Sequence, residues 1–171
     1  MHDIFQMQIS LNNLTFVENN CYLYKTSSEE IITGNFSDIC QHIHEKPEHI
    51  KYVRVPQSKE GMWIKMENGK SWETLQGWWL NAYNLAIKQE AAELTDSTNW
   101  KWWRTKVDKF DPQNLKVEII DVLHFWICQC LLMSMSFDDV KRIYKQKNEV
   151  NIKRQESKYL VKDENDCKEI V

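Results

Sequence analysis

The sequence predicts an all-α fold, a helical bundle, and three observations favour it. Only 4 of the 171 residues are glycine and 3 are proline, whereas sandwiches and barrels use glycine at their tight turns. Helix-start signals and apolar periodicity dominate the chain after residue 70. A chain of this length builds one hydrophobic core, so we expect residues 1–171 to form a single domain.

A short amphipathic helix is expected at the beginning of the chain. Phe5, Gln8 and Asn12 recur at helical spacing on one face. Three apolar residues line an adjacent face: Met7, Leu11 and Leu14. The polar pair Gln8 and Asn12 therefore points in one direction.

Residues 18–70 show no sustained period and contain three of the four glycines. Two stretches, 21–24 and 52–55, resemble short strands. We therefore expect a loop-rich insertion, with a short helix over 36–44 and room for a small hairpin.

Three longer helices follow. Ser71 is a candidate N-cap for a helix to about residue 94, and Asp111 followed by Pro112 opens a helix to about residue 135. The last helix is expected over 137–155, and the polar tail 156–171 is expected to be mobile. The apolar run 122–137 is shorter than the roughly 20 residues that a bilayer requires, so it predicts a buried bundle helix and no membrane association.

Charge and cysteine content limit the possible partners and location. The net charge of −3 is too mild for a general nucleic-acid binder, so no direct nucleic-acid contact is expected. Five widely spaced cysteines and no signal-peptide pattern predict a reducing, cytoplasmic location. No G-x-G-x-x-G or Walker motif is present, so a phosphate group would be held by side chains or metal.

Two carboxylate pairs stand out. Glu90 and Glu93 lie three residues apart on one expected helix, and Glu118 and Asp121 have the same spacing on the next. Apolar neighbours suggest that these helices are largely buried, and buried carboxylates need compensation, which hard cations such as Mg²⁺ provide. Solvated helix faces remain an alternative, and His124, three residues after Asp121, leaves iron as a minor option.

The last helix supplies the opposite charge. Lys147, Asn151 and Arg154 are spaced i, i+4, i+7, which places an ammonium, an amide and a guanidinium on one stripe suited to phosphate oxygens. Six basic residues and one acid occur between residues 141 and 154. A solvated basic face is the alternative for this basic stripe.

Four ordered motifs resemble those of the dimeric dUTPases, which belong to the all-α nucleoside triphosphate pyrophosphatase (MazG-like) superfamily. The resemblance covers residues 1–14 and roughly 83–159, and leaves 18–70 as an insertion. In order, the motifs are Gln8 to Asn12, Glu90-Ala91-Ala92-Glu93-Leu94 continuing to Trp100-Lys101-Trp102-Trp103, Glu118-Ile119-Ile120-Asp121 continuing to Phe125, and Lys147-Asn148-Glu149-Val150-Asn151 continuing to Gln155.

The resemblance implies a role for each motif. Glu90, Glu93, Glu118 and Asp121 would hold Mg²⁺, and one of the two glutamates, with Glu93 favoured over Glu90, would activate the attacking water. Gln8 and Asn12 would read the pyrimidine, and the basic stripe would grip phosphates. The walls of the site would come from the tryptophan motif: Trp100, Lys101 and Trp103.

The activity implied by the resemblance is hydrolysis of dUTP to dUMP and pyrophosphate, with dUDP as a second candidate substrate. A homodimer is the implied assembly. Three alternatives stay open: a dCTPase, a broader dNTP pyrophosphatase, and a nucleotide-binding or regulatory relative without turnover.

Overall fold

The protein is described by a computed structural model covering residues 2–56, 61–105, 110–157 and 170. It divides into two compact units, which we describe separately: one comprises His2–Ser134, and the other begins at Met135. Within the described ranges, no single helix is both long and apolar enough to span a membrane. By length and composition, helices α4 (Pro112–Leu132) and α5 (Phe137–Glu156) qualify only when combined across the break between them.

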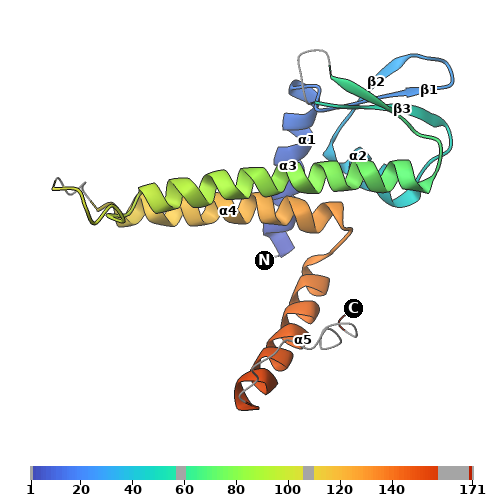
Figure 1. Ribbon diagram of the computed structural model, residues 1–171. Helices are drawn as coiled ribbons and strands as arrows, with labels where there is room; N and C mark the ends of the chain where they lie inside the picture. The colour runs from blue at the N-terminus through green and yellow to red at the C-terminus, as the bar shows by residue number, and fades with distance from the viewer. Residues whose placement is uncertain (1, 57–60, 106–109, 158–169, 171) are drawn as a thin grey trace. The chain divides into compact units, whose positions relative to one another are not determined.

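Three helices organise the first unit: α1 (His2–Glu18), α3 (Gly69–Asp96) and α4 (Figure 1). The expected N-cap Asp111 is confirmed, since its side chain accepts hydrogen bonds from the backbone N–H groups of Gln113 and Asn114. The expected cap Ser71 is wrong. Asn68 caps α3 instead, and Ser71 is one of the two residues whose N–H groups it satisfies.

A small antiparallel sheet occupies much of residues 18–70. Its strands are β1 (Tyr22–Thr26), β2 (Ile31–Gly34), β3 (Ile50–Val55) and β4 (Met62–Lys65), in the order β2-β1-β3-β4. Helix α2 (Phe36–Glu45) confirms the short helix expected over 36–44. The all-α prediction therefore holds only in part: five helices dominate, but a four-stranded sheet stands where loops and a small hairpin were expected.

The sheet uses few glycines: Gly61 has a φ of 65° directly before β4, but the β1–β2 turn forms without one. The β1–β2 turn uses Glu29 at φ 59°, a left-handed conformation that residues other than glycine adopt at some cost. Glycine is required at Gly34 for another reason, because a Cβ there would lie 2.6 Å from Cδ1 of Tyr22. Scarcity of glycine was thus a poor argument against strands in this chain.

One hydrophobic core joins the sheet to the helices. Its fully buried residues include Tyr22 and Val53 of the sheet, Ile39 of α2 and Leu75 of α3. Phe16 of α1 packs against Trp79 of α3, with ring centroids 5.0 Å apart. The core lies against the first half of α3, which leaves the second half of that helix and the first half of α4 outside it.

The start of α4 is more exposed than its apolar sequence suggested. Val117, Ile119 and Ile120 are about half exposed, whereas Ile127 and Leu132 near the end of the helix are buried. The expectation that both carboxylate helices are largely buried is therefore wrong for the part of α4 that carries Glu118 and Asp121.

The core position of Leu75 yields a stability prediction. Leu75→Ala should lower the free energy of unfolding by about 2–5 kcal/mol, because a fully buried leucine leaves a cavity when truncated. Leu85→Ala, at a position 57% exposed on the same helix, should change it by less than about 0.5 kcal/mol. Urea unfolding measures both, and equal losses would contradict this placement of the core.

The second unit contains α5, which begins at the N-cap Ser136. The Ser136 side chain accepts a hydrogen bond from the N–H of Asp139, and the Asp139 carboxylate accepts one from the N–H of Ser136. This reciprocal pair is a capping box, and it fixes the start of the helix. Helix α5 ends at Glu156, so most of the tail expected over 156–171 lies outside the described residues.

Candidate active site

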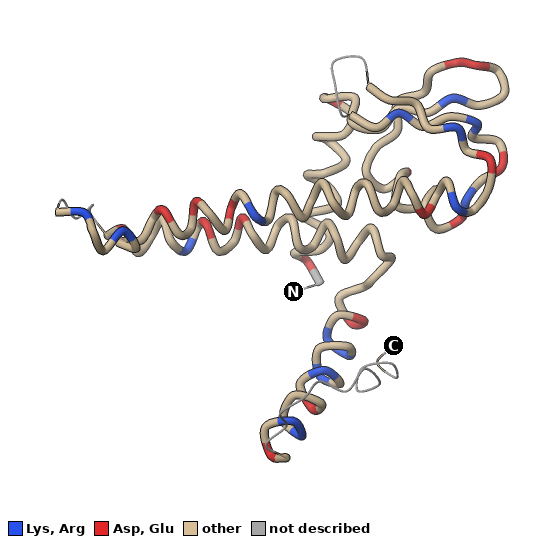
Figure 2. The backbone as a smooth tube through the Cα atoms, viewed as in Figure 1, with Lys and Arg blue, Asp and Glu red and all other residues tan. Residues whose placement is uncertain are grey.

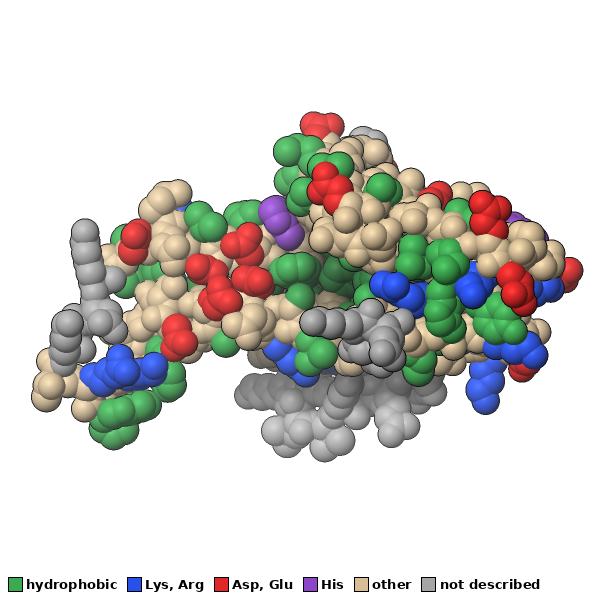
Figure 3. Space-filling view, turned by 90° about the horizontal axis from the view of Figure 1, so that it is seen from above, with side chains coloured by type: hydrophobic (Ala, Val, Ile, Leu, Met, Phe, Trp, Pro, Cys, Tyr) green, Lys and Arg blue, Asp and Glu red, His purple; other side chains and the backbone are tan. Residues whose placement is uncertain are grey.

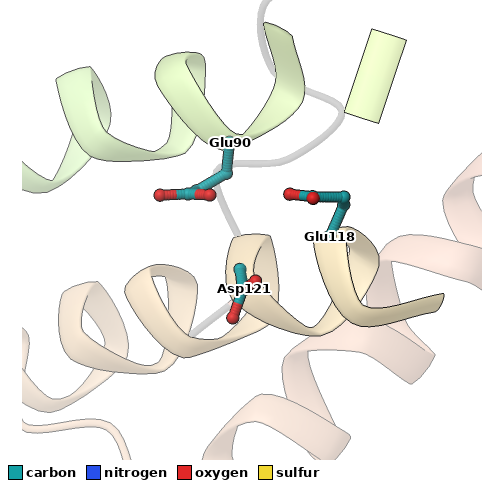
Figure 4. Close-up of side chains that lie close together, drawn as sticks. All are labelled: Glu90, Glu118 and Asp121. Atoms are coloured by element: carbon teal, nitrogen blue, oxygen red, sulfur yellow. The ribbon is translucent and has the colours of Figure 1, made fainter. Parts of the chain in front are cut away.

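Carboxylates from two facing helices converge in the first unit. Glu90 projects from α3, and Glu118 and Asp121 project from α4, with one ligand oxygen from each lying within 4.8 Å of the others (Figure 4). We call these three residues the acidic cluster. It is the only group of three or more potential metal ligands that the described part of the chain contains.

The cluster lies toward the end of the helical pair that is remote from the sheet. Acidic positions are concentrated at that end of α3 and α4 (Figure 2), and the space-filling view shows their side chains gathered on one face (Figure 3). The three residues are neither fully buried nor fully exposed. They are thus accessible to solvent while close enough to repel one another.

The negative charges around Glu90 affect its pKa. Partial burial, and then the charges of Glu93, Asp121 and Glu118, raise the pKa of the Glu90 carboxyl above its usual value of 4.5. The other three carboxylates predicted from the sequence therefore all act on Glu90. A cation placed between them would relieve this repulsion.

Glu93 lies one turn beyond Glu90 but does not belong to the acidic cluster. Its side chain is exposed, and Oε1 accepts a hydrogen bond of 2.9 Å from Nε2 of Gln89. The spacing Glu-x-x-Glu places both glutamates on one side of α3, and only Glu90 faces α4 closely. The exposed carboxylate of Glu93 can therefore contact a group outside the cluster.

Asn114 connects the acidic cluster to the end of α3. Its Nδ2 donates to Oε1 of Glu118 at 3.1 Å and to Oγ of Ser97 at 2.9 Å. Ser97 is the C-cap of α3, and Asn114 lies in the first turn of α4. The asparagine therefore positions Glu118 relative to both helices, a role that its place in the sequence did not indicate.

The amide pair Gln8 and Asn12, expected to read a base, is buried on α1. Gln8 is 6% exposed and Asn12 is 8% exposed, and Nε2 of Gln8 donates to Oδ1 of Asn12 at 2.8 Å. Both amides contact Sγ of Cys128 on α4. The structure thus brings the two residues together and places the sulfur of Cys128 against both.

The tryptophan motif surrounds Asp96 at the end of α3. Nε1 of Trp100 donates to Oδ1 of Asp96 at 2.9 Å, and Nζ of Lys101 lies 3.5 Å from the same oxygen. Trp100 and Trp103 pack edge to face with centroids 5.5 Å apart, and both stay exposed. These contacts attach the motif to Asp96, six residues beyond Glu90. The role of the motif as a wall of the site stays a prediction.

The basic stripe lies on α5, in the second unit. Lys147, Asn151 and Arg154 share one face of that helix by their spacing. Lys147 and Arg154 are partly buried and Asn151 is exposed. Figure 2 shows that Lys and Arg positions are distributed along the backbone of α5. Its role as a phosphate grip stays a prediction.

Three carboxylates from two facing helices form a group that could hold a hard divalent cation in this helical protein. Residues 57–137 match the family model described as dUTPase. The matched segment is 81 of the 171 residues, just under half of the chain, and the match supports membership of the dimeric dUTPase family. No curated protein and no solved structure matches this chain.

The match corrects the extent of the resemblance. It begins at residue 57, inside the segment 18–70 that was taken as an unmatched insertion, and it ends at residue 137. It includes both carboxylate pairs and the tryptophan motif, whereas the amide pair and the basic stripe lie outside it. The match supports a hydrolase that acts on nucleotides, a pyrophosphatase of the dUTP diphosphatase type.

Proposed function

We propose that this chain hydrolyses dUTP to dUMP and pyrophosphate with Mg²⁺ bound at the acidic cluster, and that dUDP is a second candidate substrate. The observation that carries the proposal is the convergence of Glu90, Glu118 and Asp121 from two helices within the part of the chain that matches the dUTPase family.

The donor set fits Mg²⁺. All three groups are carboxylates, and Mg²⁺ prefers carboxylate oxygens and water to nitrogen or sulfur ligands. Glu90, Glu118 and Asp121 would hold the ion, with Glu93 adjacent. The bound ion would lower the pKa of a nearby water and offset negative charge on the phosphates.

Glu93 is the proposed general base. Its exposed carboxylate lies beside the cluster, and its charge acts on Glu90. It takes a proton from the attacking water, whose oxygen bonds to the β-phosphorus. The bond from that phosphorus to the oxygen shared with the α-phosphate breaks, and dUMP leaves with the shared oxygen.

Substrate binding uses residues outside the acidic cluster. Gln8 and Asn12 contact the pyrimidine, and the amide groups of both side chains are already oriented by hydrogen bonds. Lys147, Asn151 and Arg154 contact the phosphates, and Trp100, Lys101 and Trp103 border the site. Each of these roles rests on the family resemblance together with the chemistry of the side chain.

A substrate panel tests the proposal. Purified protein is incubated with dUTP, dUDP, dCTP, dTTP and UTP, with Mg²⁺ or with EDTA, and pyrophosphate and phosphate release are measured separately. We expect pyrophosphate from dUTP with Mg²⁺ and none with EDTA. Faster turnover of dCTP would indicate a dCTPase, equal turnover of all the deoxynucleotides would indicate a broad pyrophosphatase, and binding without turnover would indicate a non-catalytic relative.

We propose further that two copies of the chain associate through α1. Helix α1 carries a row of exposed apolar side chains, from 38% to 70% exposed: Ile4, Met7, Leu11, Leu14 and Val17. This α1 apolar stripe contains no charged residue, and the whole helix contains no lysine or arginine. An uncharged apolar face is suited to contact an identical face on a second copy.

Leu14→Glu tests the assembly. A glutamate in the middle of the α1 apolar stripe would be desolvated at the contact, so we expect the particle mass measured by light scattering to fall from two chains to one. Ile31→Glu is the matched control, because Ile31 is similarly exposed, at 55%, but lies on β2. A dimer that persists in the Leu14 variant would contradict this interface.

A further inference from the structure

A buried cysteine lies against the two amides that are proposed to read the base. Nδ2 of Asn12 donates to Sγ of Cys128 at 3.1 Å, and Nε2 of Gln8 lies 3.6 Å from the same sulfur. Cys128 is 1% exposed. Its sulfur therefore joins α1 to α4 at the location of the amide pair.

The hydrogen bonds give the thiol a defined direction. Sγ of Cys128 donates to the backbone oxygen of His124 at 3.2 Å. Burial raises the pKa of the thiol, which keeps its proton in place. A thiol whose hydrogen is committed elsewhere offers only lone pairs, so each amide must turn its NH₂ group toward the sulfur.

This direction fixes the pattern that the amides present. With Nδ2 of Asn12 on the sulfur, Oδ1 of Asn12 accepts from Nε2 of Gln8 at 2.8 Å. Oε1 of Gln8 then accepts no hydrogen bond within the described residues. A carboxamide rotated by 180° would exchange donor and acceptor, so the sulfur selects one orientation of two.

The position of Cys128 along the helices relative to the acidic cluster fits the length of a nucleotide. Cys128 follows Asp121 by seven residues on α4, and the buried Tyr83 precedes Glu90 by seven on α3. Seven residues are two turns, about 10 Å. The amides and the acidic cluster are therefore separated along the helical pair, as the base and the phosphates of a nucleotide are separated by its sugar.

We propose that Cys128 is a positioning residue for base selection, which holds the Gln8 and Asn12 amides in the orientation that distinguishes uracil from cytosine. This proposal rests on the proposed function, in which the amide pair contacts the base. Uracil presents a carbonyl at C4 and a hydrogen at N3, whereas cytosine presents an amino group and a lone pair. An amide held in one orientation suits only one of these patterns.

The experiment compares binding of dUMP and dCMP in the absence of metal, by calorimetry, in four proteins: wild type, Cys128→Ala, Cys128→Ser and Cys130→Ala. Serine keeps a hydrogen-bond acceptor at the position, whereas alanine removes it. Cys130 is the matched control, because it is also buried, at 5% exposed, and lies on the same helix. Thermal unfolding of each variant establishes that it is folded.

We expect the ratio of dUMP to dCMP affinity to fall about tenfold in Cys128→Ala, the effect of losing a buried hydrogen bond. It should stay within about twofold of wild type in Cys128→Ser and Cys130→Ala. Kinetics with the triphosphates should show the same change in KM and a smaller change in kcat.

The outcomes separate the two proposals. If wild type distinguishes the two nucleotides and Cys128→Ala does so equally well, the role of Cys128 is overturned and the proposed function stands. If the ratio of dUMP to dCMP affinity falls equally in Cys128→Ser and Cys128→Ala, orientation by the sulfur is overturned. It is also overturned if the ratio falls as much in Cys130→Ala. If wild type binds neither nucleotide and hydrolyses no triphosphate, the proposed function itself fails.

Discussion

Glu93→Gln is expected to lower kcat for dUTP hydrolysis by about 10²–10⁴-fold, the usual contribution of a positioned general base. The amide keeps the size of the side chain and can still accept the hydrogen bond from Gln89, but it cannot take a proton from water. KM should change little, because the proposed substrate contacts lie elsewhere. Steady-state kinetics with pyrophosphate detection measures both constants.

Glu73→Gln is the matched control for this variant. Glu73 is another exposed glutamate of α3, and its carboxylate lies 3.6 Å from Nζ of Lys46, away from the acidic cluster. The control should retain full activity. Full activity in Glu93→Gln would exclude Glu93 as the base, and a similar loss in Glu90→Gln alone would transfer that role to Glu90.

Asp121→Asn is expected to abolish activity at low Mg²⁺ concentration and to recover part of it as Mg²⁺ is raised. The substitution removes one of the three carboxylates of the acidic cluster, and a neutral amide is a weaker ligand for a hard cation. We expect the Mg²⁺ concentration for half-maximal rate to rise at least about tenfold. An unchanged Mg²⁺ dependence would contradict the proposed site.

The stability of metal-free protein provides a second readout for Asp121→Asn. The folded state holds the pKa of Glu90 above 4.5, mainly through burial and then through Glu93, Asp121 and Glu118. The contribution of Glu90 to the free energy of unfolding is therefore present at low pH and lost as the pH rises through its raised pKa. Asp121→Asn removes one of the charges that raise this pKa, so stability should fall less with rising pH in this variant than in wild type. If Asp121 had only a structural role, Asp121→Asn would not be more stable relative to wild type at neutral pH than at low pH.

Much of the helical framework could be predicted from local signals. Asp111 followed by Pro112 marks the start of α4, since the aspartate accepts from the N–H groups of Gln113 and Asn114, and the proline has no N–H that would need a partner. The three-residue spacing within each carboxylate pair also predicted that the two members of a pair lie on one side of their helix. Such features depend on residues within one or two turns, which a sequence displays directly.

The sheet, and the contacts between α1 and α4 at Cys128, could not be predicted in this way. Strands of four to six residues have too little periodicity to distinguish them from loops, and the turn at Glu29 lacks the expected glycine. The contacts of Cys128 join residues 116 positions apart, from Asn12 on α1 to α4. Periodicity along one helix cannot specify which side chain of another helix it meets.

Apolar residues beside the carboxylates were misleading for a related reason. Ile119 and Ile120 were taken as evidence of a buried helix, yet both are about half exposed in this single chain. Hydrophobicity predicts that a surface is covered, but it does not specify whether the same chain or another copy covers it.

Helix α3 runs for 28 residues, about 42 Å. Its first half carries Trp72, Leu75 and Trp79, which pack into the core, and its second half carries Glu90 and Glu93, which lie outside the core. The residues that stabilise the fold and those of the proposed site are thus separated along one helix. Substitutions at the sheet-bearing end can therefore raise or lower stability without touching the proposed site.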